Sequence, residues 1–186
     1  KEYPIRNEHG GASISGFCES RNHEIIISVW NGRVYHLDKE KDEFIPYPDK
    51  MRSRNPTVMV QDNEQDYFWL ATWGDGVVRF DPSAPGDSMF VYSEIPVNAA
   101  GEEDGLILSL AQDDKLGYIW LTTGHDFMAL QIQPDRTLKQ LKFPAGLLPV
   151  NHMLVEVLKG KECLWVSAFD RPSFIVHLMD NMTKDY

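Results

Sequence analysis

The sequence has few basic residues, two cysteines and no long apolar run. Its 18 Lys and Arg stand against 28 Asp and Glu, which gives a formal net charge of -10. Nucleic-acid binding depends on clustered Lys and Arg that neutralise phosphates, and the sequence has no such cluster, so we expect no nucleic-acid contact. No apolar run approaches the roughly 18 residues of a membrane-spanning helix. We therefore expect contact with a membrane only through parts outside this chain.

The scarcity of metal-ligating side chains in close spacing also excludes several chemistries. None of the six histidines lies near a cysteine or another histidine at the spacing of a zinc site, so we predict no metal and no cofactor. Cys18 and Cys163 are interpreted as small buried hydrophobes, and whether they form a disulfide does not follow from sequence. Because the chain begins at Lys1, we interpret it as a piece of a larger protein.

One stretch, Tyr67–Pro82, organises the rest of the chain. Tyr67–Thr72 is dense in aromatic and β-favouring residues and predicts a strand. Trp73–Gly76 predicts a tight turn, because its two glycines supply the positive φ that a hairpin needs. Val77–Phe80 then predicts a second strand, which the following Asp-Pro pair ends.

The chain contains four copies of this stretch, including Tyr67–Pro82 itself. The repeats are centred on Ile26, Trp69, Trp120 and Trp165, at intervals of 43, 51 and 45 residues. The longer interval contains an insertion, Val97–Gly105. A period in the low forties with several short strands per copy is typical of β-propeller blades.

We therefore predict an all-β fold, a single β-propeller region over residues 1–186 with four-stranded antiparallel blades. The blades are expected at residues 13–48, 55–93, 106–142 and 151–180. Their inner strands are predicted at Ser13–Glu19, Thr57–Gln61, Ile107–Gln112 and His152–Leu158, and their second strands at Glu24–Val29, Tyr67–Thr72, Tyr118–Thr123 and Cys163–Ala168. The third and fourth strands follow at Arg33–Leu37, Glu43–Tyr47, Val77–Phe80, Met89–Tyr92, Phe127–Ile132, Leu138–Leu141 and Phe174–Leu178. No segment shows helical periodicity.

Four blades are few for a propeller, since the general range is four to eight. A closed ring of four blades is one alternative. We favour the other, a fragment of a larger propeller of the seven-bladed type. Open sheet edges invite partners, so we also expect a homodimer or edge-to-edge self-association.

The repeats resemble those of the two-component regulator propeller family. The second copy carries the pattern most fully, as Val58–Asp62 followed by Phe68–Pro82, and the third keeps Leu110–Asp113 and Ile119–Gly124. The first copy has Ile26 in place of Trp, and the fourth has Phe169–Pro172 in place of the glycine turn.

The resemblance implies a function outside the cytoplasm. In that family such repeats build the extracytoplasmic sensor domain of hybrid two-component histidine kinases of gut Bacteroidetes. They are similar to domains that bind polysaccharide breakdown products. The resemblance thus implies a periplasmic, ligand-sensing segment without catalysis of its own, whose kinase and DNA-binding parts lie elsewhere.

The residues that follow each second strand are the candidate ligand site. In a propeller these turns share one face with the connections between blades, near the central channel where ligands bind. Aromatic rings stack on sugar faces, and charged or imidazole groups bind hydroxyls. The candidate residues are Trp30, Trp73, Asp75, His125, Asp126, Asp170 and Arg171. The alternative is that Trp30 and Trp73 only pack the turns, as the repeated Trp69, Trp120 and Trp165 are expected to pack the core.

Two other functions remain open from the sequence. One is a propeller enzyme that acts on polysaccharides, a lyase or a glycoside hydrolase, since Asp and Glu are plentiful and any fold can host a carboxylate pair. The other is a structural scaffold for protein interactions. The acidic run Glu102–Asp104 lies in the insertion and is interpreted as a solvated loop, because its spacing does not match a calcium site.

Overall fold

The computed structural model describes most of the chain. The described residues are 2–7, 10–11, 13–30, 33–48, 51–52, 55–113, 117–124, 126–141, 150–158, 161–168 and 174–177, and for 6–7, 10–11, 150–158, 161–168 and 174–177 the backbone alone. This part is all-β, and its one helical element is the single 3-10 turn η1 (Gly86–Ser88). Within these residues no helix is long and apolar enough to cross a membrane.

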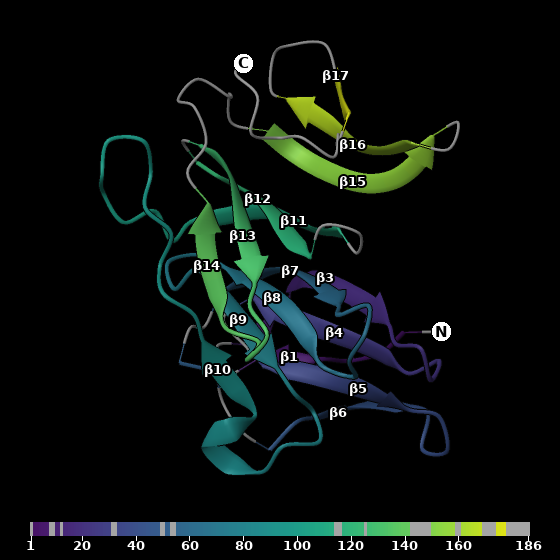
Figure 1. The fold of residues 1–186 in the computed structure, drawn as a ribbon. Coiled ribbons are helices and arrows are strands. Elements are labelled where there is room, and N and C mark those ends of the chain that lie inside the picture. Colours follow the sequence, from purple (N-terminus) through teal and green to yellow (C-terminus); the bar gives the residue numbers. More distant parts are fainter. Residues whose placement is uncertain are drawn as a thin grey trace.

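Four antiparallel sheets follow one another along the chain (Figure 1). The first sheet contains β3 (Ser13–Glu19), β4 (Ile25–Trp30), β5 (Val34–Asp38) and β6 (Glu43–Pro46). The second contains β7 (Pro56–Gln61), β8 (Phe68–Thr72), β9 (Val77–Phe80) and β10 (Phe90–Tyr92). The third contains β11 (Ile107–Asp113), β12 (Tyr118–Thr123), β13 (Phe127–Ile132) and β14 (Leu138–Leu141). The fourth contains β15 (Val150–Leu158), β16 (Lys161–Ala168) and β17 (Phe174–His177).

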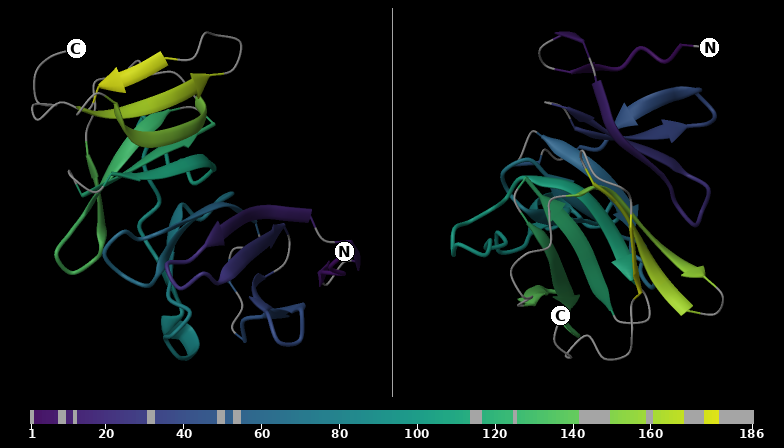
Figure 2. Two further views of the ribbon diagram at one scale, coloured as in Figure 1. Left: turned by 90° about the vertical axis from the view of Figure 1, so that its right-hand side faces the viewer. Right: turned by 90° about the horizontal axis from the view of Figure 1, so that it is seen from above.

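These strands confirm the predicted all-β fold and its strand positions to within two residues at each end. The predicted entry segment before residue 13 contains a short hairpin of β1 (Arg6–Asn7) and β2 (Gly10–Gly11). The sheets stand in a row, each against the next, and their first strands β3, β7, β11 and β15 lie side by side on the inside (Figures 1 and 2). The first and fourth sheets therefore form the two ends of the row.

The hydrophobic core lies between neighbouring sheets. Between the first and second sheets, Ile26 and Val34 pack against Met59, Phe68 and Leu70. Between the second and third sheets, the side chains that meet are Tyr67, Trp69, Ala71, Val77, Ile107, Leu110, Ile119, Leu121, Met128 and Leu130. Successive residues of a strand point to opposite faces, so the second and third sheets each have one face toward the preceding sheet and one toward the next. Trp69 and Trp120 are fully buried, as predicted for core residues.

The two ends of the sheets carry different connections. One end, which we call the Trp73 end, carries the turns after β4, β8 and β12 and the connections from one sheet to the next. The opposite end, the Asp62 end, carries the turns from the first to the second strand and from the third to the fourth. This division follows from the antiparallel strand order.

Because of Tyr47, which lies just after β6, we expect the folded protein to lose stability at alkaline pH. Its ring packs edge-on against Phe80, with ring centroids 4.9 Å apart, and burial, helped by Glu24, raises its pKa to about 12. The folded state therefore favours neutral tyrosine, and this contribution, complete below pH 10, is lost as the pH rises toward 12. We expect Tyr47→Phe to lose less stability than the natural chain between pH 8 and pH 11 in urea unfolding. Equal losses in both proteins would contradict this assignment.

Candidate ligand-binding site

The Trp73 end brings together turns from different sheets. The turn 73–76 is hydrogen-bonded to the connection that leads to the third sheet, because Gly74 N and Gly76 N both donate to Gly105 O (2.8 and 3.3 Å). Earlier in the same connection, Ala99 N donates to Asp126 Oδ2 (2.7 Å) in the turn after β12. The insertion Val97–Gly105 thus ties the second sheet to the third at this end.

Trp30 and Trp73 are in contact across two sheets. Their ring centroids are 4.9 Å apart at an interplanar angle of 68°, an edge-to-face pair. Trp30, at the end of β4, is partly buried, and Trp73 belongs to the exposed residues, with 50% of its surface accessible. The backbone N–H of Trp73 donates to Asn55 O (2.8 Å), which fixes the start of its turn. The pair presents an exposed aromatic ring supported from one side.

The turn that carries Trp73 is held by its own polar groups. Thr72 Oγ1 donates to Gly76 O (2.8 Å) and accepts a hydrogen bond from Asp75 N (3.1 Å). Gly74 and Gly76 have φ of 124° and 68°, values that side chains other than glycine's rarely adopt. The predicted glycine turn is confirmed, and it carries both Trp73 and Asp75.

Asp75 faces a cation, Arg52, that was not among the site residues predicted from the sequence. Arg52, in the connection from the first to the second sheet, lies 3.5 Å from Asp75 Oδ1. Its guanidinium carbon is 4.1 Å from the centroid of the Tyr92 ring, and its backbone N–H donates to the Tyr92 hydroxyl. The sequence could have indicated Arg52 as a site residue, because it lies in a connection between two sheets and all such connections lie at the Trp73 end. Charged, aromatic and hydrogen-bonding groups therefore lie together here.

The remaining candidate residues are placed differently. Asp126 lies in the next turn along, where its carboxylate holds the insertion through Ala99 N and its backbone N–H donates to Thr123 Oγ1 (2.9 Å). His125, Asp170 and Arg171 lie outside the described residues. The structure thus groups Trp30, Trp73 and Asp75 and sets Asp126 one turn away.

The acidic run in the insertion is not a fully solvated loop, so that expectation is wrong for Asp104. Asp104 is only 5% exposed, and its Oδ2 accepts a hydrogen bond from Thr123 Oγ1 (2.5 Å). The insertion folds back through an isolated bridge between Val97 and Glu103, which brings Asp104 under the turn after β12. Glu102 and Glu103 remain exposed.

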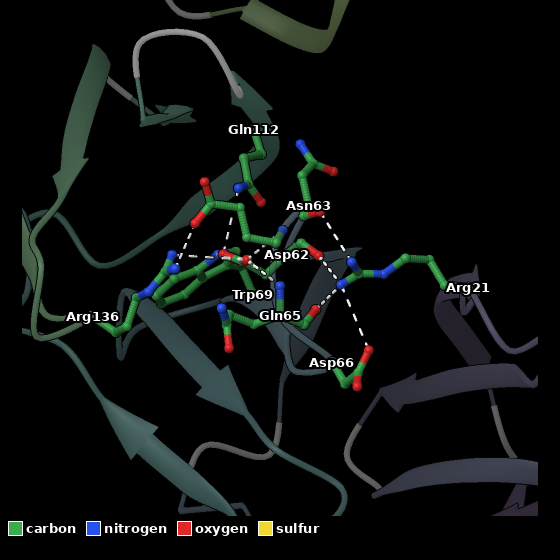
Figure 3. A network of polar contacts seen from close by, with 9 residues as sticks. Arg21, Asp62, Asn63, Gln65, Asp66, Trp69, Gln112 and Arg136 are labelled. Carbon is green, nitrogen blue, oxygen red and sulfur yellow. Dashed lines mark hydrogen bonds and ion pairs between the residues drawn. The ribbon is translucent and has the colours of Figure 1, made fainter.

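A polar network at the Asp62 end serves the fold (Figure 3). The carboxylate of Asp62 is fully buried; Oδ2 accepts a hydrogen bond from Trp69 Nε1 (2.9 Å), and Oδ1 accepts from Glu64 N and Gln65 N (3.0 and 2.9 Å). Trp120 Nε1 donates to Asp113 Oδ2 (3.3 Å) in the third sheet. The seven-residue spacing between Asp and Trp therefore pairs each carboxylate with its indole, a role beyond fixing the turn.

Neighbouring sheets hold the Asp62 turn from both sides (Figure 3). From the first sheet, Arg21 donates to the carbonyl oxygens of Asp62 (2.7 Å), Asn63 (3.0 Å) and Gln65. From the third sheet, Gln112 Nε2 donates to Asp62 Oδ2 (3.4 Å) and Arg136 lies 4.0 Å from Asp62 Oδ1.

The Asp62 end also contains a pocket of about 390 Å³, lined by residues that include Gln112, Gln131, Gln133, Arg136 and Glu64. Its charged groups are paired with each other, because Arg136 donates to Glu64 Oε2 (2.6 Å), and this bond raises the pKa of Arg136. In the described part of the chain no group of three His, Cys, Asp or Glu residues could hold a metal ion. Cys18 is a free, half-buried thiol whose pKa is raised by burial. We therefore place the candidate site at the Trp73 end.

Comparison with known proteins supports the fold. No family model and no curated protein matches the sequence. The extracellular domain of a B. thetaiotaomicron protein described as a hybrid two component system matches over 98% of this chain, with a TM-score of 0.61, 13% identity and 24% of its own length covered. Virginiamycin B lyase from Staphylococcus aureus matches over 97%, with a TM-score of 0.66, 18% identity and 56% of its length covered.

A structure described as the Dos1 propeller also matches, over 89% of this chain, with a TM-score of 0.60, 9% identity and 41% of its length covered. This chain is part of a β-propeller. It spans between about a quarter and just over half of the length of the three structures compared. As the resemblance predicted, the structures that share its fold include extracellular domains of proteins described as hybrid two component systems. At these identities the likeness concerns the fold.

Proposed function

We propose that this propeller segment is the ligand-sensing part of an extracytoplasmic, periplasmic receptor of the two-component type. Its ligand is an oligosaccharide derived from a polysaccharide, bound at the Trp73 end. The observation that carries the proposal is the exposed Trp73 ring, supported edge-on by Trp30. Extracellular domains of proteins described as hybrid two component systems share the fold, and they support the cellular role.

The chemistry of the Trp73 end suits a sugar. An exposed indole offers a flat apolar face on which a pyranose ring can stack, and binding sites combine such surfaces with a few placed polar groups. Asp75 and Arg52, 3.5 Å apart, supply an acceptor and several donors for hydroxyl groups. Binding here would change the contacts between neighbouring sheets, because Trp30 and Trp73 belong to different sheets. A sensor needs such a change and does not need turnover.

Trp73→Ala should weaken oligosaccharide binding at least tenfold, because the substitution removes the stacking surface and leaves the core untouched. Calorimetric titration of a panel of oligosaccharides against the natural chain identifies a binder, which is then measured with the variant. Tyr3→Ala is the matched control, since Tyr3 is also a partly exposed aromatic but lies beside Asp42, in a turn of the Asp62 end. Unchanged affinity in a folded Trp73→Ala protein would overturn the site.

The same titration separates sensing from catalysis. The second candidate is a polysaccharide-cleaving enzyme, and virginiamycin B lyase shows that the same fold occurs in an enzyme. Saturable binding with the oligosaccharide recovered intact supports the sensor, whereas shortened or unsaturated products would support the enzyme. Analysis of the incubated oligosaccharides by mass spectrometry distinguishes the two.

A further inference from the structure

The pocket at the Asp62 end lies between the second and third sheets and has no part in the function proposed above. Its volume of about 390 Å³ falls within the range of small-molecule sites, roughly 300 to 1,000 Å³. The second sheet contributes Glu64, in the turn before β8. The third sheet contributes residues of β11, of β13 and of the turn between β13 and β14, among them Gln112, Gln133 and Arg136.

The charged groups of this pocket are already satisfied within the protein. Arg136 donates to Glu64 Oε2 (2.6 Å). The Asp62 carboxylate beside them is fully buried, and both of its oxygens accept hydrogen bonds from backbone or indole N–H groups. A charged ligand of either sign would have to break the Arg136–Glu64 pair or lie against a like charge. The pairing therefore disfavours a charged ligand and leaves the pocket to a neutral one.

The side-chain amide of Gln112 is held at one end and open at the other (Figure 3). Its Nε2 donates to Asp62 Oδ2 (3.4 Å), and this contact orients the amide, because the amide oxygen would be repelled by the carboxylate. Oε1 is buried and has no hydrogen-bond partner among the described residues. A buried acceptor without a partner is costly. A ligand that supplies a donor to this oxygen therefore gains affinity from it.

The equivalent glutamine between the first and second sheets has its acceptor filled. In the second sheet Gln61 pairs with Phe68. In the third sheet Gln112 holds the same register position, opposite Ile119. Gln61 Oε1 accepts a hydrogen bond from Arg21 N (2.7 Å), a backbone group of the first sheet. In the part of the chain that the structure describes, no such group reaches Gln112 Oε1, and this glutamine lines the pocket.

A small rearrangement would admit a ligand to this oxygen. Gln112 Oε1 is shielded from solvent, but the wall of the pocket contains long side chains. One of them, Gln133, donates a long hydrogen bond from Nε2 to Gln131 O (3.3 Å), which is weak enough to exchange for a bond to a ligand. Ile132 adds apolar surface to the lining. Apolar surface with a few placed polar groups is the usual composition of a small-molecule site.

We propose that this pocket is a second binding site, which takes a small neutral molecule rich in hydroxyl groups, of the size of a monosaccharide. One hydroxyl donates to Gln112 Oε1, and others bind the amide of Gln133 and the outer atoms of the Arg136–Glu64 pair. Hydroxyl groups suit these partners because each can both donate and accept. The pocket lies at the opposite end of the sheets from the Trp73 end, so this inference does not depend on the site proposed there.

NMR titration of the chain with glucose, galactose and mannose tests the proposal. We expect at least one of them to shift the side-chain NH₂ signals of Gln112 and Gln133 in a saturable way. The uronic acids and amino sugars of the same configuration keep the ring and add a charge. They should bind about tenfold more weakly, because the added charge must lose its water beside groups that are already paired. The absence of a shift at Gln112 with all three neutral sugars, or charged forms that bind equally well or better, overturns the proposal.

Two glutamine variants test the role of the open acceptor. Gln112→Met keeps the length of the side chain and removes the acceptor, so the affinity for the sugar should fall about tenfold. Gln61→Met is the matched control, because Gln61 holds the same register position but its acceptor is filled by Arg21 N. Its affinity should stay within about twofold of that of the natural chain. Equal affinities of the two variants, with circular dichroism showing both to be folded, would exclude Gln112 as the binding group. The indole N–H signal of Trp73 reports binding at the other end separately.

Discussion

Asp62→Ala is expected to lower the free energy of unfolding by about 3 kcal/mol, a large effect for one side chain. The substitution leaves the buried Trp69 Nε1 without its acceptor (2.9 Å in the natural chain) and removes the acceptor of two backbone N–H groups in the turn. It also removes the charge that Arg136 and Gln112 approach from the third sheet. Urea unfolding followed by tryptophan fluorescence measures the loss.

The control for this prediction is an exposed carboxylate of the same turn. Asp66 contacts Arg21 at 3.8 Å, but its side chain is 85% exposed, so Asp66→Ala should change stability by less than about 0.5 kcal/mol. Asp113→Ala removes the equivalent acceptor of Trp120 and should also destabilise the protein. Similar small losses for all three variants would show that the buried Asp–Trp hydrogen bond has little weight.

Gly105→Ala should destabilise the protein by about 2 to 3 kcal/mol and disturb the candidate site directly. A Cβ at this position would lie 2.3 Å from Gly74 O and 2.7 Å from its carbonyl carbon. Both partners are backbone, so neither can rotate away, and the hydrogen bonds from Gly74 N and Gly76 N to Gly105 O must lengthen or break. Hydrogen exchange of those two amides by NMR should become faster than in the natural chain.

Gly124→Ala serves as the matched control for Gly105→Ala. A Cβ on Gly124 would meet the end of the Leu106 side chain at 3.2 Å, and a flexible side chain can move by a few tenths of an ångström. We expect a small change in stability and unchanged exchange at Gly74 and Gly76. If Gly105→Ala behaves like this control, the insertion does not constrain the Trp73 turn.

The sequence predicted what depends on neighbours along the chain. Strand positions follow from local composition and from punctuation such as Gly74 and Gly76, and the period of the repeats indicated a propeller. The burial of Trp69 was also predicted from the sequence. Three of the four copies carry a tryptophan in the middle of the second strand, and an indole repeated at that position is expected to pack in the core. The grouping of Trp30 with Trp73 was within reach for the same reason, since both follow the second strand of a repeat.

What the sequence did not predict depends on contacts between sheets. Arg52 meets Asp75, and Arg136 meets Glu64, across 23 and 72 residues of sequence. The repeat pattern does not specify such pairs, because they involve turns and connections whose lengths differ from copy to copy. Asp104 was misassigned for a related reason: an acidic run reads as solvated until the path of its loop brings one carboxylate under Thr123.

The row of sheets has a consequence for how such a chain can change over evolution. Each sheet contacts the sheets beside it along the row, so its stability is the sum of its own terms and those of its two interfaces. A duplicated or deleted repeat alters one junction and leaves the distant cores as they were. Drift within a copy is tolerated in the same way, as when Ile26 stands where other copies carry tryptophan and still packs against Met59 and Phe68. The stability of this architecture is thus determined largely at the junctions between neighbouring repeats.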